Sequence, residues 1–200
     1  MIHNSILFDI GATKTRVAFS ENGESFEEPA VYPTPQNYEE IVDKLVETGR
    51  NLAKGREIRR VCGGASRKVI PDYEKFRNNL ESLFGESSKG IEVFVENDAA
   101  LAGLGEAHFG AGRGAEIIAY LTVSTGVGGA RIVNGELDER VVGFEPGKQI
   151  LDADNGDTLE DMVSGSALTQ KTGKHPKAIT EPEIWEALAQ KLAVGLYNIT

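Results

Sequence analysis

A chain of 200 residues, with 40% hydrophobic and 26% charged residues, is long enough to bury a substantial core in one domain or two small ones. Its formal charge of −10 argues against nucleic acid or an anionic membrane as the main partner, and its single cysteine, Cys62, excludes an intrachain disulfide. The chain shows neither a signal-peptide pattern nor an apolar run of membrane-spanning length, so a cytoplasmic protein in a reducing compartment is the expectation.

The first half of the chain alternates between strand and helix patterns. In chain order we expect strand Ser5–Ile10, strand Arg16–Ser20, a helix from Tyr38 to Leu52, strand Ile58–Cys62, a helix around Phe76–Phe84, strand Ile91–Val95 and a helix that begins with the capping residues Asn97 and Asp98. The first two strands should form a hairpin, and Gly63 and Gly64 should close the strand that precedes them.

The second half begins after a glycine-rich stretch, Gly110–Glu116, which is the best candidate for a domain hinge. Strands are expected over Glu116–Val123 and Ala130–Asn134, and an amphipathic helix over Pro182–Thr200. Because strands alternate with helices along the chain, the fold class is predicted to be α/β. The predicted domains are residues 1–112 and 113–200.

Two segments resemble each other, "LFDIGATKTRVAF" and "LTVSTGVGGARIV", since each has a strand, a turn of Gly, Ser and Thr, and a second strand. Such turns can direct backbone N–H groups and hydroxyls at phosphate, and the hydroxyls here belong to Thr13, Thr15, Ser124 and Thr125. Lys14 adds a positive charge, and Asp9 at the strand end could hold a hydrated Mg²⁺ ion. The alternative is that both are ordinary hairpin turns, which also favour Gly and Thr.

Five segments together resemble the ROK family of sugar kinases, a branch of the actin-like ATPase superfamily. They are "DIGATKTRVA", "STGVGGARIVNG", "VFVENDAALAGLGEAHFGAG", "GFEPGKQIL" and "TLEDMVSGSAL", in the order expected for the family. The resemblance implies two RNase H-like α/β domains flanking a cleft, the second of them incomplete here. It also implies a carbohydrate kinase that transfers the γ-phosphoryl group of ATP, with Mg²⁺, to a hydroxyl of a hexose or amino sugar.

The same resemblance assigns roles to individual residues. Asp98 would be the catalytic base, and Asn97, Glu145, Glu160 and Gly64 would contact the sugar. The nucleotide would be bound by Asp9, Gly11, Ala12, Thr13, Lys14, Ser124, Thr125, Gly126 and Gly128. Without the resemblance, Asn97 and Asp98 could be simple helix caps, and the two glutamates could be solvated surface carboxylates.

The sequence departs from the family around Lys148, which stands where many members have a zinc-binding His followed by a Cys cluster. With no His or Cys there, we expect no zinc site. We predict instead that the Lys148 ammonium pairs with Glu145 or Glu160; the alternative is a lysine that points into solvent. The loop after Gly64 is also shorter than the family's sugar-binding loop, and the family continues beyond the position of Thr200 with a segment that contacts adenosine.

These departures leave two other functions open. One is a non-catalytic protein of the same fold that binds a sugar or a nucleotide. The other is a fragment that needs a partner chain to complete its second domain. In every case we expect a small-molecule sugar and ATP as partners rather than nucleic acid or membrane, and a homodimer remains open.

Overall fold

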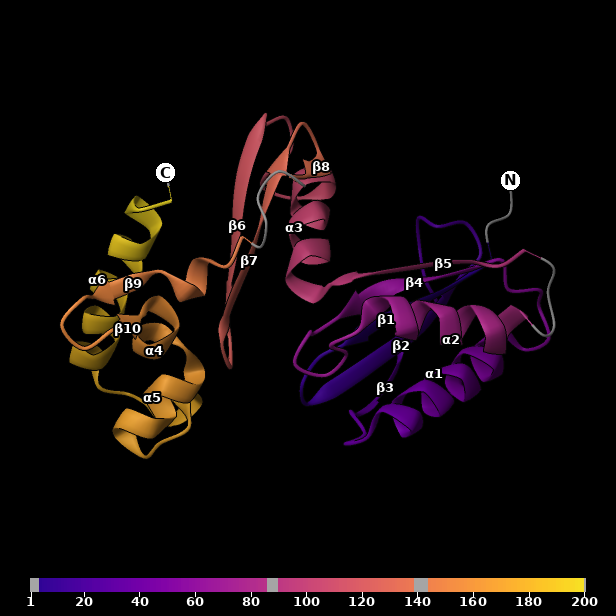
Figure 1. Ribbon diagram of the computed structural model, residues 1–200, viewed down its shortest axis with the longest axis horizontal. Coiled ribbons are helices and arrows are strands. Elements are labelled where there is room, and N and C mark those ends of the chain that lie inside the picture. The colour runs from indigo at the N-terminus through magenta and orange to yellow at the C-terminus, as the bar shows by residue number, and fades with distance from the viewer. Residues whose placement is uncertain (1–3, 86–89, 139–143, 200) are drawn as a thin grey trace. The chain divides into compact units, whose positions relative to one another are not determined.

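The computed structural model of the protein describes residues 4–85, 90–138 and 144–199 (Figure 1). The chain divides into two compact units, Met1–Leu101 and Ala102–Thr200. The division falls inside helix α3 (Asp98–Phe109), whose first turn belongs to the first unit. The domain boundary after residue 112 that the sequence suggested stays a prediction.

The first unit contains a mixed five-stranded sheet. Its strands are β1 (Ser5–Ile10), β2 (Lys14–Ser20), β3 (Ala30–Pro33), β4 (Arg60–Ala65) and β5 (Glu92–Asn97), and their order in the sheet is β3-β2-β1-β4-β5. The first three strands are antiparallel neighbours, whereas β1, β4 and β5 run parallel. The carboxyl ends of the parallel strands therefore lie along one edge of the sheet.

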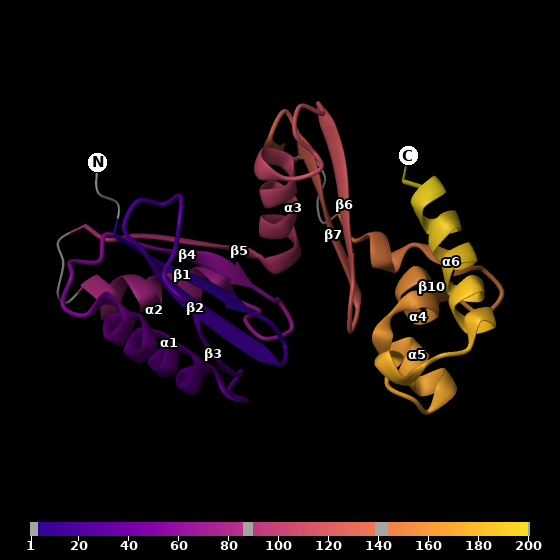
Figure 2. The same ribbon diagram turned by 180° about the vertical axis from the view of Figure 1, so that it is seen from behind.

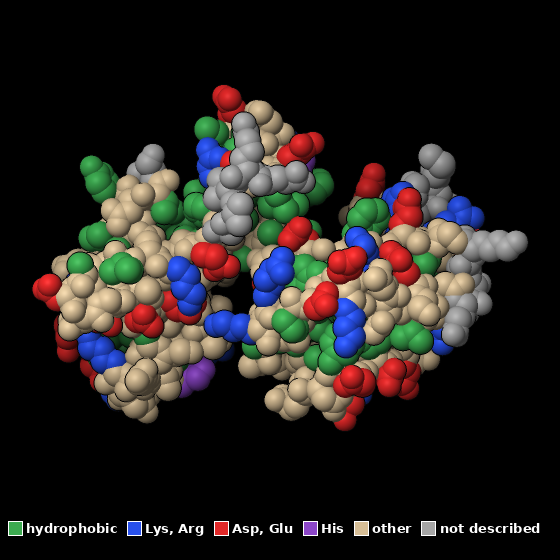
Figure 3. Space-filling view, in the orientation of Figure 1, with side chains coloured by type: hydrophobic (Ala, Val, Ile, Leu, Met, Phe, Trp, Pro, Cys, Tyr) green, Lys and Arg blue, Asp and Glu red, His purple; other side chains and the backbone are tan. Residues whose placement is uncertain are grey.

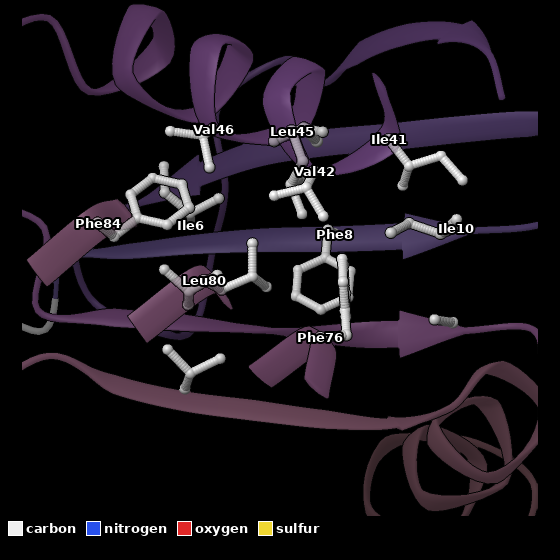
Figure 4. Close-up of a cluster of buried hydrophobic side chains, with 14 of the residues drawn as sticks. Ile6, Phe8, Ile10, Ile41, Val42, Leu45, Val46, Phe76, Leu80 and Phe84 are labelled. Carbon is white, nitrogen blue, oxygen red and sulfur yellow. The ribbon is translucent and has the colours of Figure 1, made fainter. Parts of the chain in front are cut away.

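Helices α1 (Tyr38–Ala53) and α2 (Tyr73–Gly85) pack against one face of this sheet (Figures 1 and 2). Apolar side chains at helical spacing on α1 point toward Ile6, Phe8 and Ile10 of β1, and Phe76 and Phe84 reach the same layer from α2 (Figure 4). Asn37 caps α1 by accepting a hydrogen bond from Glu40 N at 2.8 Å, and this cap fixes where the helix begins. The structure thus confirms the two helices that the apolar periodicity predicts.

Strand β4 continues to Ala65, so the expectation that Gly63 and Gly64 close it is wrong. A Cβ added at Gly63 would lie 2.0 Å from the backbone oxygen of Phe8 on the neighbouring strand. The glycine is needed because the Phe8 backbone and ring lie so close, not because the chain turns there. Strand β5 likewise extends to Asn97, two residues beyond its expected end.

After the remainder of α3, the second unit contains an antiparallel sheet of β6 (Ile117–Val123), β7 (Val127–Val133) and β8 (Glu136–Leu137). After it come η1 (Pro146–Lys148), β9 (Ile150–Asp152), β10 (Asp157–Thr158), α4 (Leu159–Val163), α5 (Gly165–Thr172), η2 (Pro176–Ala178) and α6 (Pro182–Tyr197). One core cluster of this unit consists of Val127, Leu159 and Val163, and Leu188 and Leu192 of α6 pack against these residues. The sequence predicted the hairpin and α6, but not α4 or α5.

No helix within the described residues is both long and apolar enough to cross a membrane. On the visible face, basic and acidic side chains are interspersed over each unit (Figure 3). The alternation of strands and helices confirms the predicted α/β class.

Candidate active site

The parallel strands of the first unit bring several predicted site residues to one sheet edge. Asp9 on β1 lies directly opposite Gly64 on β4, and Gly64 lies opposite Glu96 on β5. One residue further along, Ile10, Ala65 and Asn97 form the last row, and the first turn and α3 begin immediately beyond it. Ligands of α/β proteins bind at this end of parallel strands.

The first turn, Gly11–Thr13, connects β1 to β2, and Thr34 donates hydrogen bonds to two of its carbonyl groups. Gly11 N donates to Lys14 O at 3.0 Å and closes the turn. The Thr34 hydroxyl donates to Gly11 O at 2.8 Å, and Thr34 N donates to Thr13 O at 3.2 Å. Two carbonyl oxygens of the turn are therefore engaged inside the protein, where they would not repel a phosphate.

The side chains of this turn and of the first two residues of β2 divide into an exposed and a buried group. Ala12, Thr13 and Lys14 are exposed, as a ligand-binding turn requires. Thr15 is only 1% exposed and its hydroxyl lies 3.0 Å from that of Thr34, so it supports the turn from inside instead of offering a donor to a ligand. No sequence pattern linked Thr34 to this turn, because Thr34 lies 23 residues after Gly11 and the two meet only when β3 pairs with β2.

Asp9 is paired with Arg16, its direct neighbour across the β1–β2 ladder. The Arg16 Nη1 atom lies 2.6 Å from Asp9 Oδ2, and both side chains are about half exposed. A single carboxylate at a strand end suits a hydrated Mg²⁺ ion, which keeps several waters and uses one or two protein carboxylates. Asp9 fits that role, with the Arg16 guanidinium as the cation that now balances its charge.

Helix α3 begins at the end of β5 and is capped by the two residues that the sequence singled out. Asn97 Oδ1 accepts hydrogen bonds from Ala99 N at 3.0 Å and Ala100 N at 3.2 Å, and Asp98 Oδ1 accepts from Ala99 N at 3.0 Å. Asn97 is therefore the N-cap residue, whereas Asp98 is the first residue of the helix and accepts a hydrogen bond from the next amide.

Gly64 fixes how close Asp98 can come to the sheet. A Cβ added at Gly64 would lie 2.9 Å from the Cα atom of Asp98, a distance that real side chains do not adopt. Tyr73 supports the same region, because its hydroxyl donates a hydrogen bond to the carbonyl of Ala65. Burial, opposed by a hydrogen bond from Asn97, raises the pKa of Tyr73 to about 12. Tyr73 was missed in the sequence, which gives no sign of its contact with Ala65.

The second turn, Ser124–Gly126, connects β6 to β7 and is also held by its carbonyl groups. Gly165 N at the start of α5 donates to Ser124 O at 2.7 Å, and Ser166 N donates to Thr125 O at 3.2 Å. A Cβ at Gly165 would lie 2.9 Å from Ser124 O, so only glycine allows this approach. Ser124 and Thr125 remain exposed. The two turns thus share an arrangement, with their carbonyls bound inside and their hydroxyl side chains at the surface.

A cavity of about 600 Å³ lies beside the second turn within the second unit. Its lining is largely apolar and includes Ser124, Thr125, His175, Trp185 and Leu188. The Trp185 indole donates a hydrogen bond to Ile179 O at 3.1 Å, which holds the ring at the cavity wall. An aromatic ring next to a hydroxyl-rich turn suits a ligand with a planar base and a phosphate group.

The segment around Lys148 confirms the predicted ion pair. Lys148 Nζ lies 3.1 Å from Glu160 Oε1, and this hydrogen bond with Glu160 raises the pKa of Lys148. Glu160 Oε2 accepts a hydrogen bond from Val127 N at 2.7 Å. Glu145, the other predicted partner, is exposed at the start of η1 and contributes a weaker Coulombic effect on Lys148. The first residue of the "GFEPGKQIL" segment, Gly143, lies outside the described residues.

Comparison with known proteins places these features in a family. Residues 6–199 match the ROK family. The chain is 31% identical over 138 residues to a glucokinase of Streptomyces coelicolor, covering 64% of this chain and 43% of that protein. It is 30% identical over 166 residues to a beta-glucoside kinase of Listeria monocytogenes, covering 68% and 53%. The chain therefore spans about half the length of these relatives.

Solved structures agree with this result. The crystal structure of a ROK hexokinase from Thermus thermophilus superposes with a TM-score of 0.76 at 26% identity, covering 98% of this chain and 77% of that one. A ROK family glucokinase from Streptomyces griseus, in complex with glucose and AMPPNP, has the same fold, with a TM-score of 0.75 at 23% identity and coverage of 98% and 78%. Since the family match extends over nearly the whole sequence, the chain belongs to the ROK family.

Proposed function

We propose that this protein is a sugar kinase that transfers the γ-phosphoryl group of ATP to a hydroxyl of a hexose or amino sugar. One observation carries the proposal. The sheet edge of the first unit combines the first turn, Gly64 and the helix-capping carboxylate Asp98 on adjoining strand ends. A candidate phosphate-binding turn and a candidate general base at the same edge support the proposal, because phosphoryl transfer to an alcohol requires both.

In this mechanism Asp98 orients the sugar hydroxyl and accepts its proton as the hydroxyl attacks the γ-phosphorus. Asp98 lies at the N-terminus of α3, and Gly64 sets its distance from β4. The Asn97 oxygen is used as a cap, so its amide N–H₂ group is the part of the side chain offered to the sugar. The resemblance to the family assigns further sugar contacts to Glu145 and Glu160, and the Glu160 oxygens also accept hydrogen bonds from Val127 N and Lys148 Nζ.

The nucleotide is assigned to the two turns and to the cavity at Trp185. Ala12, Thr13 and Lys14 would face phosphate from the first turn, and Ser124–Gly126 with Gly128 from the second. The cavity of about 600 Å³ would hold the nucleoside part. Asp9 would hold Mg²⁺ through water, and the bound ion would neutralise negative charge on the phosphate oxygens.

The test is an assay of ADP release over a panel of sugars, with Asp98→Asn as the key variant. Replacing the carboxylate by an amide removes the base and leaves a group that can still cap α3. We expect kcat to fall by about a hundredfold or more. Asp72→Asn is the matched control, because Asp72 caps α2 through Lys75 N at 2.9 Å on the same unit. Equal turnover in the two variants would reject Asp98 as the base.

A non-catalytic protein that binds sugar or nucleotide is the second candidate. It is favoured by two contacts that already engage proposed functional groups, Asn97 with α3 and Asp9 with Arg16. The same assay separates the two functions when it is combined with calorimetric titration. Heat of binding for ATP or a sugar, without ADP release for any sugar in the panel, would support the binding protein and contradict the kinase.

A further inference from the structure

The amide group of Val127 has a partner that bears on the second turn. Val127 is the first residue of β7, directly after Gly126, and it is only 4% exposed. Its N–H donates to Glu160 Oε2 at 2.7 Å, a short bond to a charged acceptor from a different element, α4. Bonds of this kind are stronger than those between neutral groups. The end of the second turn is therefore attached to Glu160.

Glu160 is in turn held by Lys148. The other carboxylate oxygen, Oε1, lies 3.1 Å from Lys148 Nζ. The Lys148 side chain is 62% exposed, whereas that of Glu160 is 20% exposed, so the pair has one end at the surface and one end against β7. The ammonium thus favours the orientation in which Oε2 faces Val127 N.

Close backbone packing keeps the three groups in place. A Cβ added at Gly147 would lie 2.4 Å from Val127 O, and one added at Gly129 would lie 2.6 Å from Pro146 Cγ. The short helix η1, which ends at Lys148, is therefore pressed directly against β7. Thr158 and Asp161 form a capping box that fixes the start of α4, where Glu160 is the second residue.

We propose that Lys148 is a positioning residue for the second turn and acts through Glu160 on the Val127 amide. Lys148 itself contacts no nucleotide in this arrangement. Its ammonium holds the Glu160 carboxylate, the carboxylate holds Val127 N, and the turn keeps the geometry that presents Ser124 and Thr125. The effect on nucleotide binding rests on the proposed function, whereas the effect on the turn does not.

The first arm of the test measures the turn without any ligand. In amide NMR spectra of the whole chain, Lys148→Met should shift the Val127 amide proton upfield and speed its exchange with solvent, because its acceptor is less firmly held. Lys174→Met is the matched control, since Lys174 forms an ion pair with Glu181 in the same unit, far along the chain from Val127. If the two variants leave the Val127 signal equally unchanged, the positioning role is wrong.

The second arm measures affinity for ATP by calorimetric titration. Lys148→Met should weaken binding by about two- to fivefold, the range of a partly exposed ion pair. Glu160→Gln keeps an oxygen for Val127 N but cannot pair with Lys148, so it should resemble Lys148→Met. The affinity of Glu160→Ala for ATP should be lower than that of the parent chain by about fivefold or more, because the buried Val127 amide loses its acceptor. If Glu160→Ala does not fold, Glu160→Gln carries the comparison.

The outcomes separate the two ideas. A shifted Val127 signal with no ATP binding by the parent chain would contradict the proposed function and support the positioning role. ATP binding that is normal in Lys148→Met, together with an unshifted Val127 signal, would overturn the positioning role and leave the proposed function standing.

Discussion

Gly64 lies on β4, where an added Cβ would come within 2.9 Å of the Cα of Asp98, the first residue of α3. We predict that Gly64→Ala displaces the start of α3 and lowers kcat/KM for the sugar by about tenfold to a hundredfold, since small displacements of a reacting group are costly. The measurement is steady-state kinetics together with thermal unfolding, which shows whether stability changes in parallel.

Gly105→Ala is the control for this change. Gly105 also lies on α3, and a Cβ there would face open space among the described residues. Alanine in a helix is favoured over glycine by about 1 kcal/mol, so this variant should be slightly more stable and fully active. If Gly64→Ala were as active as Gly105→Ala, the spacing between β4 and α3 would not matter for function.

Single residues also show what the sequence could and could not predict. The Lys148–Glu160 pair was predicted because opposite charges are close together in one short segment. Arg16 and Thr34 were not predicted as partners of Asp9 and the first turn. Their contacts depend on which strands pair and in which register, and residue types alone do not specify register.

At the scale of elements, the first hairpin depends on β3 to hold its turn. We predict that Thr34→Val destabilises the protein by about 1–3 kcal/mol, because the buried Thr15 hydroxyl and the Gly11 carbonyl each lose a hydrogen-bond partner. Denaturant unfolding measures the change. ATP binding should also weaken, since the turn would keep its bond from Thr34 N but lose the one from the Thr34 hydroxyl.

Thr172→Val serves as the comparison, because the Thr172 hydroxyl donates to Leu168 O and contacts the exposed backbone of Lys174 at the end of α5, where water can replace lost partners at little cost. Equal destabilisation by both changes would mean that Thr34 does not organise the turn.

Elements with strong periodicity, such as α1 and α2, could be predicted from sequence. Strand β4 could not, since Gly63 and Gly64 suggest a turn until the position of Phe8 is known.

At the scale of the whole molecule, acid should destabilise both units. The Lys174 ammonium holds the pKa of Glu181 at about 2, below its ordinary value of 4.5, and Arg56 lowers the pKa of Glu27 in the first unit. A carboxyl group with a lowered pKa stabilises the folded state above its unfolded pKa, and this contribution is lost as pH falls through the folded value. Tm should therefore decline between about pH 4.5 and pH 2.

Lys174→Met tests this assignment by removing the partner of Glu181. Its Tm should fall less than that of the parent chain across the same pH range, at low ionic strength where exposed charges are least screened. An identical decline in both proteins would show that Glu181 does not contribute to acid sensitivity. The Glu27–Arg56 pair is unaffected by this change, so its contribution to the fall in Tm should be the same in both proteins.

The two turns also differ in how tolerant they should be of sequence drift. The carbonyls of the second turn are bound by two main-chain amides, that of Gly165, where close packing admits only glycine, and that of Ser166, which nearly every residue type would supply. One carbonyl of the first turn is bound by the hydroxyl of Thr34, which only Thr or Ser could replace. Over evolutionary time, related chains should therefore vary freely at Ser166 but keep a hydroxyl residue at Thr34.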